Sequence, residues 1–193
     1  MSDPRIRDPR REDDSLDAAL ADFLDAFDVP FLKVASASLT DSALLERIKD
    51  TGRPIVLSTG MSTANEIAEA VAGLDWSNLV VLHCTSSYPT PEDEVNLRAM
   101  QRLAAKYPFP VGFSSHEQGT TITLAAVALG ACVVERHVTL DRSMWGSDQS
   151  VSLEPAELTE LVRSIRTVEA ALGNGIKTVY PSELPIREKL RRV

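Results

Sequence analysis

Short runs of apolar, β-branched residues alternate along most of the chain with amphipathic segments of helical length. Such runs between turn signals predict buried strands, and apolar residues spaced three and four apart predict helices. Strands are predicted at residues 31–36, 54–60, 79–85, 111–113 (leading into Ser114, Ser115 and His116) and 131–137. Helices are predicted at residues 15–27, 41–50, 64–74, 95–106, 121–129 and 154–172.

This order of strand and helix indicates a repeated βα unit. Nearly continuous apolar runs are typical of strands that are buried on both faces of a parallel sheet. Right-handed crossovers place the carboxyl ends of all five strands on one rim, which is where ligands bind in α/β folds. The predicted fold class is therefore α/β with an all-parallel sheet.

Composition and charge argue against a membrane-spanning or nucleic-acid-binding protein. The chain has 193 residues, of which 44% are hydrophobic, and it contains no apolar run of membrane-spanning length. The net charge of −8 argues against a nucleic-acid surface. Residues 1–14 are highly charged and are expected to form a disordered leader rather than a signal peptide, and residues 15–193 to form one domain. Cys84 and Cys132 fall in predicted buried strands, so we expect reduced thiols in a cytoplasmic protein.

Two histidines lie at the carboxyl ends of neighbouring predicted strands. His116 follows the strand at 111–113, and His137 ends the strand at 131–137. Because the two strands are parallel and adjacent in sequence, both imidazoles should reach the same rim, where they could hold a divalent metal with open positions for substrate. The alternative is that each histidine is an ordinary hydrogen-bonded residue at a strand end.

The other strand ends carry small hydroxyl residues and one lysine. Hydroxyls, free backbone N–H groups and a lysine are the ingredients of a phosphate site. The alternative for any single serine is an ordinary helix N-cap. Lys33 fits that alternative poorly, because a lysine inside an apolar run must be held by an anion or extend to solvent. The strand-end residues are Lys33, Ser36, Ser58, Thr59, Thr85, Ser86, Ser87, Tyr88, Ser114 and Ser115.

Several motifs, in order along the chain, resemble those of a known family. They are FLKVASASLTD, PIVLSTGMST, VVLHCTSSYPTPEDEVNLRAM, VGFSSHEQG, ACVVERHVTLDRSMWGSDQSVSLEP and ALGNGIKTVYPSE. Together they resemble the sialic acid synthase (N-acetylneuraminate synthase, NeuB-type) family from about Ser15 to the C-terminus. The resemblance implies a TIM-type (β/α)8 barrel and a transferase that condenses phosphoenolpyruvate with an N-acyl amino sugar to form a nonulosonic acid.

The family's functional residues carry over position by position. The resemblance implies that Mn2+, Mg2+ or another divalent metal binds His116 and His137, which with Lys33 would be catalytic. The implied phosphoenolpyruvate contacts are Lys33, Ser36, Ser58, Ser86 and Ser114, and the implied sugar contacts are Tyr88 and Asp148.

The sequence also departs from the family pattern. Ser115 replaces the aspartate of the family's SDH motif, Ser38 replaces a common acidic residue, and Trp145 to Asp148 replace a PGPD segment. These differences indicate a divergent branch and leave the acceptor sugar open.

The family's first three strands and its antifreeze-like domain have no counterpart in these 193 residues. The expected fold is thus the last five βα units of the barrel, with open edges that favour self-association or a homo-oligomer. The competing hypotheses are a non-catalytic remnant, a partner-binding fragment, or a related phosphoenolpyruvate-dependent sugar-acid synthase.

Overall fold

The computed structural model describes residues 14–192, with side chains from residue 19 onward. The leader expected at residues 1–14 lies outside this range, except for Asp14, which begins the first helix. Among the described residues, no helix is both long and apolar enough to cross a membrane.

Five strands alternate with helices, as the sequence pattern predicts. The strands are β1 (Leu32–Val34), β2 (Ile55–Ser58), β3 (Leu79–Cys84), β4 (Val111–Ser115) and β5 (Val134–Arg136). The α-helices are α1 (Asp14–Asp25), α2 (Ser42–Asp50), α3 (Ala64–Ala72), α4 (Leu97–Lys106), α5 (Thr121–Ala128), α6 (Pro155–Leu172) and α7 (Leu184–Leu190). Short 3-10 turns occupy Ser36–Ser38, Trp76–Asn78, Glu92–Glu94, Gln149–Val151 and Pro181–Glu183.

The element boundaries differ from the prediction at a few places. The strand expected over residues 131–137 is only Val134–Arg136, although Cys132 and Val133 just before it also form backbone hydrogen bonds with β4. Cys132, expected to be buried in that strand, is exposed, whereas Cys84 is buried. Helix α4 begins at Leu97 rather than Val95, since Asn96 adopts a left-handed conformation with a φ of 49°.

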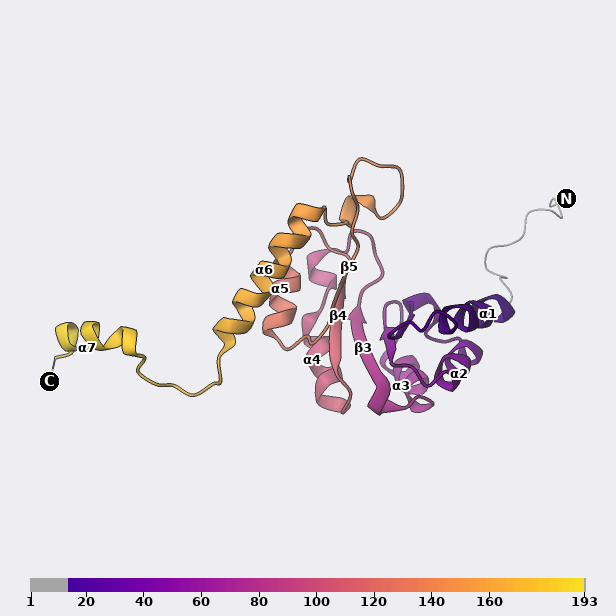
Figure 1. The fold of residues 1–193 in the computed structure, drawn as a ribbon, viewed down its shortest axis with the longest axis horizontal. Coiled ribbons are helices and arrows are strands. Elements are labelled where there is room, and N and C mark those ends of the chain that lie inside the picture. Colours follow the sequence, from indigo (N-terminus) through magenta and orange to yellow (C-terminus); the bar gives the residue numbers. More distant parts are fainter. Residues whose placement is uncertain (1–13, 193) are drawn as a thin grey trace.

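The five strands form one parallel sheet in the order β1-β2-β3-β4-β5. In a flat sheet, β1 and β5 would be about 19 Å apart, because neighbouring strands are separated by about 4.8 Å. Lys33 on β1 nevertheless forms a salt bridge with Glu135 on β5, with 3.1 Å between Nζ and Oε2. The sheet therefore curls into an arc, which is a TIM-type half-barrel with its helices on the outside (Figure 1).

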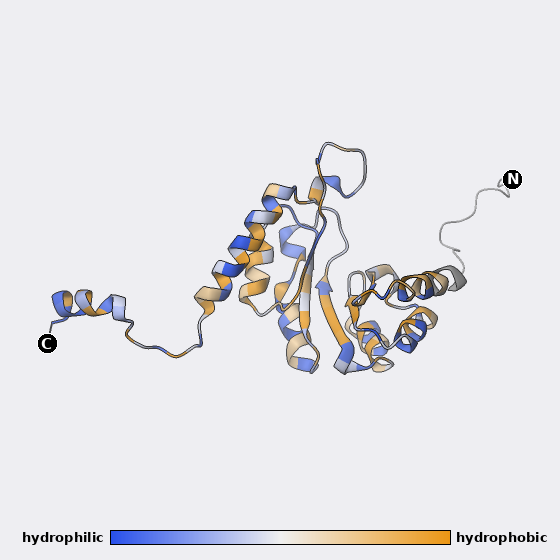
Figure 2. Cartoon of the chain, in the orientation of Figure 1, coloured by the Kyte–Doolittle hydropathy of each residue, from blue (hydrophilic) through white to orange (hydrophobic). Residues whose placement is uncertain are grey.

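The core lies between the convex face of the arc and the helices. Leu32 and Val34 of β1 are buried toward the helices, while Lys33 between them is exposed toward the concave side. The same alternation along the other strands gives a continuous core of strand and helix side chains. Figure 2 shows apolar residues along the strands and on the helix faces that cover them.

Two glycines allow close approach within the sheet region. A Cβ on Gly112 of β4 would lie 2.5 Å from the Val133 carbonyl oxygen and 2.6 Å from Leu82 Cδ2. A Cβ on Gly60, just after β2, would lie 2.0 Å from Ser86 Oγ and 2.8 Å from Ser36 Oγ. The absence of a side chain at Gly112 thus allows Val133 and Leu82 to pack against β4, and its absence at Gly60 allows the Ser36 and Ser86 hydroxyls to approach the backbone.

Large exposed apolar side chains lie mainly outside the concave face. They occur on α1 and just after it (Leu20, Phe23, Leu24, Phe27), on the loop before α6 (Leu140, Met144, Trp145) and on the C-terminal segment (Ile176, Val179, Tyr180, Leu184, Ile186, Leu190). The C-terminal segment and α7 extend away from the body of the molecule (Figure 1). On the concave face, Val56 and Val80 are partly buried.

Candidate active site

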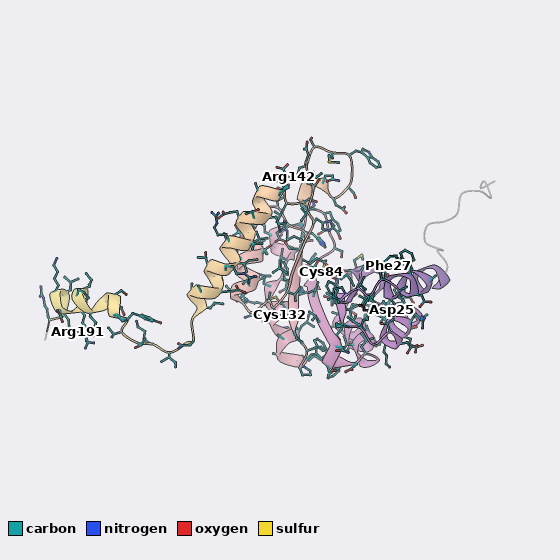
Figure 3. The ribbon with its side chains drawn as sticks, viewed as in Figure 1. Asp25, Phe27, Cys84, Cys132, Arg142 and Arg191 are labelled. Carbon is teal, nitrogen blue, oxygen red and sulfur yellow. The ribbon has the colours of Figure 1, made fainter. Side chains whose placement is uncertain are left out.

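A cavity of about 460 Å³ lies at the carboxyl ends of the five strands. It contains eight of the nine site residues predicted from the sequence, which are Lys33, Ser36, Ser58, Ser86, Tyr88, Ser114, His116 and His137. The rim thus collects residues that are more than 100 positions apart in the chain, as a parallel sheet requires. Figure 3 shows Cys84, another lining residue, at the carboxyl end of β3.

The ninth predicted residue, Asp148, lies beside the cavity. It does not line the cavity, but its Oδ2 is 3.8 Å from Nδ1 of His137. Asp148 directly precedes a 3-10 turn and accepts a hydrogen bond from Ser147 Oγ at 2.7 Å. The structure therefore places Asp148 next to His137 at the edge of the site.

Three aromatic rings form a cluster on one side of the cavity. The ring centroids of His116 and His137 are 5.2 Å apart. The ring of Tyr88 lies 4.2 Å from His116 and 5.6 Å from His137. His116 is buried, whereas the Tyr88 side chain is 44% exposed and marks the cavity mouth. The expectation that both histidines reach the same rim is confirmed.

The two histidines could supply at most two side-chain ligands to a divalent metal. His116 Nδ1 is 2.8 Å from the Thr85 carbonyl oxygen, and His137 Nδ1 faces the Asp148 carboxylate. At His116 the acceptor at Nδ1 holds the proton there and leaves Nε2 as the ligating nitrogen, whereas at 3.8 Å the Asp148 carboxylate is too far from His137 Nδ1 for a hydrogen bond. Among the described residues, no group of three or more His, Cys, Asp and Glu side chains could hold a metal. The pair would therefore supply two ligands and leave other positions open.

The cavity shifts the pKa values of its titratable groups in opposite directions. Burial, together with the neighbouring His116, lowers the pKa of His137. For His116, burial is opposed by contacts with the Cys84 thiol and the Thr85 carbonyl, which raise its pKa overall. Burial likewise opposes, but does not outweigh, the hydrogen bond from His116 that lowers the pKa of Cys84. The lowered pKa of His137 favours its neutral, metal-binding form, whereas the raised pKa of His116 favours its protonated form.

Glu135 is the main site residue that the sequence reasoning missed. Its Oε2 is 3.1 Å from Lys33 Nζ, and its Oε1 accepts a hydrogen bond of 2.8 Å from Ser114 Oγ. The anion expected to hold Lys33 is therefore a carboxylate of the protein itself. A signal was present in the sequence, because Glu135 lies two residues before His137 and so faces the same side of the strand.

The serines of the rim are not α-helix N-caps. Asp41 caps α2, and Thr63 caps α3 through a capping box with Glu66. Ser36 Oγ instead accepts a hydrogen bond of 3.0 Å from the Gly60 N–H. The buried Ser58 Oγ has no hydrogen-bond partner among the described residues. A buried hydroxyl without a partner at the cavity wall is available to a ligand.

The chain is similar in sequence and fold to known proteins. A sequence model of the NeuB family matches residues 15–177. The chain is 45% identical over 179 residues to N-acetylneuraminate-9-phosphate synthase of Homo sapiens, covering 91% of this chain and 50% of that protein. It is 44% identical over 172 residues to N,N'-diacetyllegionaminic acid synthase of Campylobacter jejuni, covering 86% and 52%.

A solved structure agrees with these sequence matches. The N-acetylneuraminic acid (sialic acid) synthetase of Leptospira borgpetersenii superposes with a TM-score of 0.79 at 40% identity, covering 89% of this chain and 62% of that one. The chain spans about half the length of the curated relatives it matches. The matched range includes every strand of the sheet and every residue of the site. The chain therefore belongs to the NeuB family.

Proposed function

We propose that this chain carries the phosphoenolpyruvate and metal sites of a synthase that condenses phosphoenolpyruvate with an N-acyl amino sugar. The observation that carries the proposal is the single cavity that joins Lys33, the hydroxyl-bearing strand ends and the two histidines. The relatives named above are synthases of sialic acid or of a related nonulosonic acid. The product class we propose for this chain is therefore a sialic-acid-like nonulosonic acid.

In this proposal Lys33 and the serines hold the anionic groups of phosphoenolpyruvate. The free hydroxyl of Ser58, the Ser114 hydroxyl and the Lys33 ammonium all lie at the cavity wall. The anion must compete with Glu135 for Lys33 and Ser114. Ser36 and Ser86, held together around Gly60, supply further donors on the same side. Positioning of the two substrates is the main task of these residues.

His116 and His137 are the proposed ligands of Mn2+, or of Mg2+ or another divalent ion. Such an ion supplies a Lewis acid for the sugar aldehyde when bound. Tyr88 at the cavity mouth and Asp148 beside His137 are placed to contact the sugar. The charge of Asp148, 3.8 Å from His137 Nδ1, also favours a proton on Nδ1, which leaves Nε2 free.

The acceptor is proposed only as the class of N-acyl amino sugars. Relatives at similar identity differ in the sugar acid that their names give, so identity alone does not select one sugar. The nearest rival is a related phosphoenolpyruvate-dependent sugar-acid synthase. A panel of acceptor sugars separates these possibilities.

The binding half of the proposal is tested with the chain itself. Phosphoenolpyruvate should raise the Tm by mass action in the presence of Mn2+, and Lys33→Met should remove most of this rise. Arg47→Met is the matched control, because Arg47 is also ion-paired but lies on α2, outside the lining of the cavity. An equal rise in wild type and Lys33→Met would contradict the assignment of Lys33.

Catalysis is tested separately by phosphate release from phosphoenolpyruvate. Because β1 and β5 are open edges of the described sheet, we expect the chain alone to show no turnover and to self-associate. Fusion to the three preceding βα units of a full-length relative should restore turnover with at least one N-acyl amino sugar. If phosphoenolpyruvate binds but the folded fusion never turns over, the chain is a binding remnant. Robust turnover by the 193-residue monomer would refute the need for the additional strands.

A further inference from the structure

A buried polar network lies on the outer, helix-facing side of β4 and β5. The side chains of Glu117 and Arg136 are 2% and 3% exposed and form an ion pair, with 3.3 Å between Oε1 and Nη1. Ser115 and Thr123 complete the network, with 3.1 Å between their hydroxyl oxygens. Both hydroxyls also contact Arg136 Nη1 and Glu117 Oε1. The network crosses from β4 to β5 and α5.

Each member of the ion pair is the sequence neighbour of one histidine of the cavity. Glu117 directly follows His116, and Arg136 directly precedes His137. Successive residues of a strand point to opposite faces, so Glu135 lies on the cavity side while Arg136 points to the helix side. The ion pair therefore joins, behind the cavity wall, the two backbone segments that carry the histidines.

The guanidinium also binds backbone atoms directly. Arg136 Nη2 donates to the Glu117 carbonyl oxygen at 3.1 Å and to the Val151 carbonyl oxygen at 3.3 Å. The first bond fixes the backbone one residue after His116. The second fixes the segment that follows Asp148. A single side chain thus links the parts of the backbone that carry His116, His137 and Asp148.

The His137 ring is held less firmly than the His116 ring. Its polar contact is the 3.8 Å approach to Asp148, whereas His116 Nδ1 has a 2.8 Å bond to the Thr85 carbonyl oxygen. The backbone of His137 is better held, because β5 pairs with β4 and the His137 carbonyl oxygen accepts a hydrogen bond of 2.9 Å from the Leu153 N–H. The orientation of the His137 ring therefore depends on the backbone that carries it.

Stability alone does not account for such a pair. Removing two charges from water is costly, and replacing a buried ion pair by apolar residues of similar size is often neutral or stabilising. Arg136 Nε also has no hydrogen-bond partner among the described residues. What apolar residues cannot reproduce is the fixed geometry of a guanidinium that bonds a carboxylate and two carbonyl oxygens at once.

We propose that the Glu117–Arg136 ion pair is a positioning device that sets the separation and orientation of His116 and His137. It acts through the backbone of the two strand ends and does not itself contact a ligand. The inference rests on the proposed function where it assigns both histidines to one metal ion. Its claim about the geometry of the histidines can be tested without metal.

The test compares the double variant Glu117→Met/Arg136→Met with wild type. The matched control is Arg166→Met/Glu169→Met, which removes an exposed ion pair of 2.7 Å on α6 and changes the same charges. The chain has three histidines, so NMR of protein labelled at histidine Cε1 gives three ring signals. His83 serves as an internal reference, because its ring bonds the Val95 carbonyl oxygen and lies outside the cavity.

The double variant should keep the Tm of wild type while the ring signals of His116 and His137 shift or broaden. The His83 signal should stay in place, and the control should show three unchanged signals. Calorimetric titration with Mn2+ alone should give a dissociation constant about 10- to 100-fold weaker in the double variant than in wild type. Unmoved histidine signals in a folded double variant would overturn the inference.

The two readouts separate this inference from the proposed function. If wild type takes up no Mn2+ but the double variant displaces the signals of His116 and His137, positioning is supported and the metal proposal fails. If Mn2+ binds wild type and the double variant equally, and their histidine signals coincide, the positioning role is refuted and the metal proposal stands. If the double variant does not fold, the same NMR measurement is made on Arg136→Lys, because lysine keeps the charge but cannot bond all of the acceptors that arginine bonds. A displaced His137 signal in that variant supports the inference, and an unmoved one refutes it.

Discussion

Replacing Glu135 by glutamine should strengthen the binding of inorganic phosphate to the cavity. The Glu135 carboxylate occupies the two groups that an anion needs, Lys33 Nζ at 3.1 Å and Ser114 Oγ at 2.8 Å. Glutamine keeps the size of the side chain and a carbonyl oxygen that can accept from Ser114. It cannot form an ion pair with Lys33, so the ammonium becomes available to phosphate.

The magnitude follows from the distance and exposure of the pair. Two unit charges 3.1 Å apart attract by about 5 kcal/mol at an effective dielectric constant of about 20, and by about 1.3 kcal/mol in bulk water. The side chains of Lys33 and Glu135 are 29% and 38% exposed, so solvent screening reduces the net value toward that of surface pairs. We expect about 1 kcal/mol, which is about a fivefold gain in phosphate affinity.

Isothermal titration calorimetry at low salt measures this change. Glu169→Gln is the control, because it removes the same charge from an exposed pair on α6, far along the chain from the cavity residues. Phosphate should bind about five times more tightly to Glu135→Gln than to wild type or to the control, with a smaller gain at high salt. Equal gains in both variants would indicate an effect of net charge. Unchanged or weaker binding to Glu135→Gln would refute the competition between Glu135 and phosphate.

Other predictions follow from single contacts. Gly112→Ala should cost about 1–3 kcal/mol in urea unfolding, because its Cβ meets the Val133 carbonyl. Gly60→Ala should instead abolish the phosphate-induced rise in Tm with little loss of stability, because its Cβ displaces movable serine hydroxyls; equal stability losses would contradict this distinction. Burial lowers the pKa of His83 below 6.5, so its neutral form in the folded state contributes stability that is complete above about pH 6.5 and is lost as the pH falls toward the folded pKa. In urea unfolding measured from pH 8 to pH 5, the unfolding free energy of His83→Gln should fall less toward acid pH than that of wild type. The same pH dependence in both proteins would refute the role of His83. Thr63→Ala should lower the unfolding free energy by about 1 kcal/mol by removing the cap of α3, and a value near zero would show that the cap is dispensable.

The strands and the rim could be predicted from the sequence, because both depend on the residues of each strand and on the order of strands along the chain. Apolar runs identify the strands, and the parallel arrangement brings Lys33, Ser58 and His137 to one rim without any knowledge of side-chain packing. The Lys33–Glu135 pair could not be read in the same way, because it depends on how strongly the sheet curls between its first and last strands. Tertiary packing, rather than local pattern, decides such contacts.

The errors near β5 have a related physical cause. The apolar pattern of residues 131–137 indicates a buried strand, but burial depends on what packs against each side chain, which the local pattern does not contain. Cys132 is exposed, although its N–H bonds the Val111 carbonyl oxygen at 3.0 Å as a strand residue would. The Glu117–Arg136 pair was missed because two charged residues in sequence give no sign that both are buried on the helix side.

The alternation of faces along β4 and β5 limits how this protein can be recombined with its relatives. Consecutive side chains serve different layers. Those of Ser114, Glu135 and His137 face the cavity, while Arg136 lines the cavity but directs its buried side chain to Ser115 and Glu117 on the helix side. A chimera whose crossover adds or removes one residue within β5 would exchange these layers, moving the Arg136 side chain into the cavity and its neighbours into the core. Junctions placed in the helix-to-strand loops leave this parity intact. Substitutions test single contacts, but insertions within these strands would test the whole assignment of faces at once.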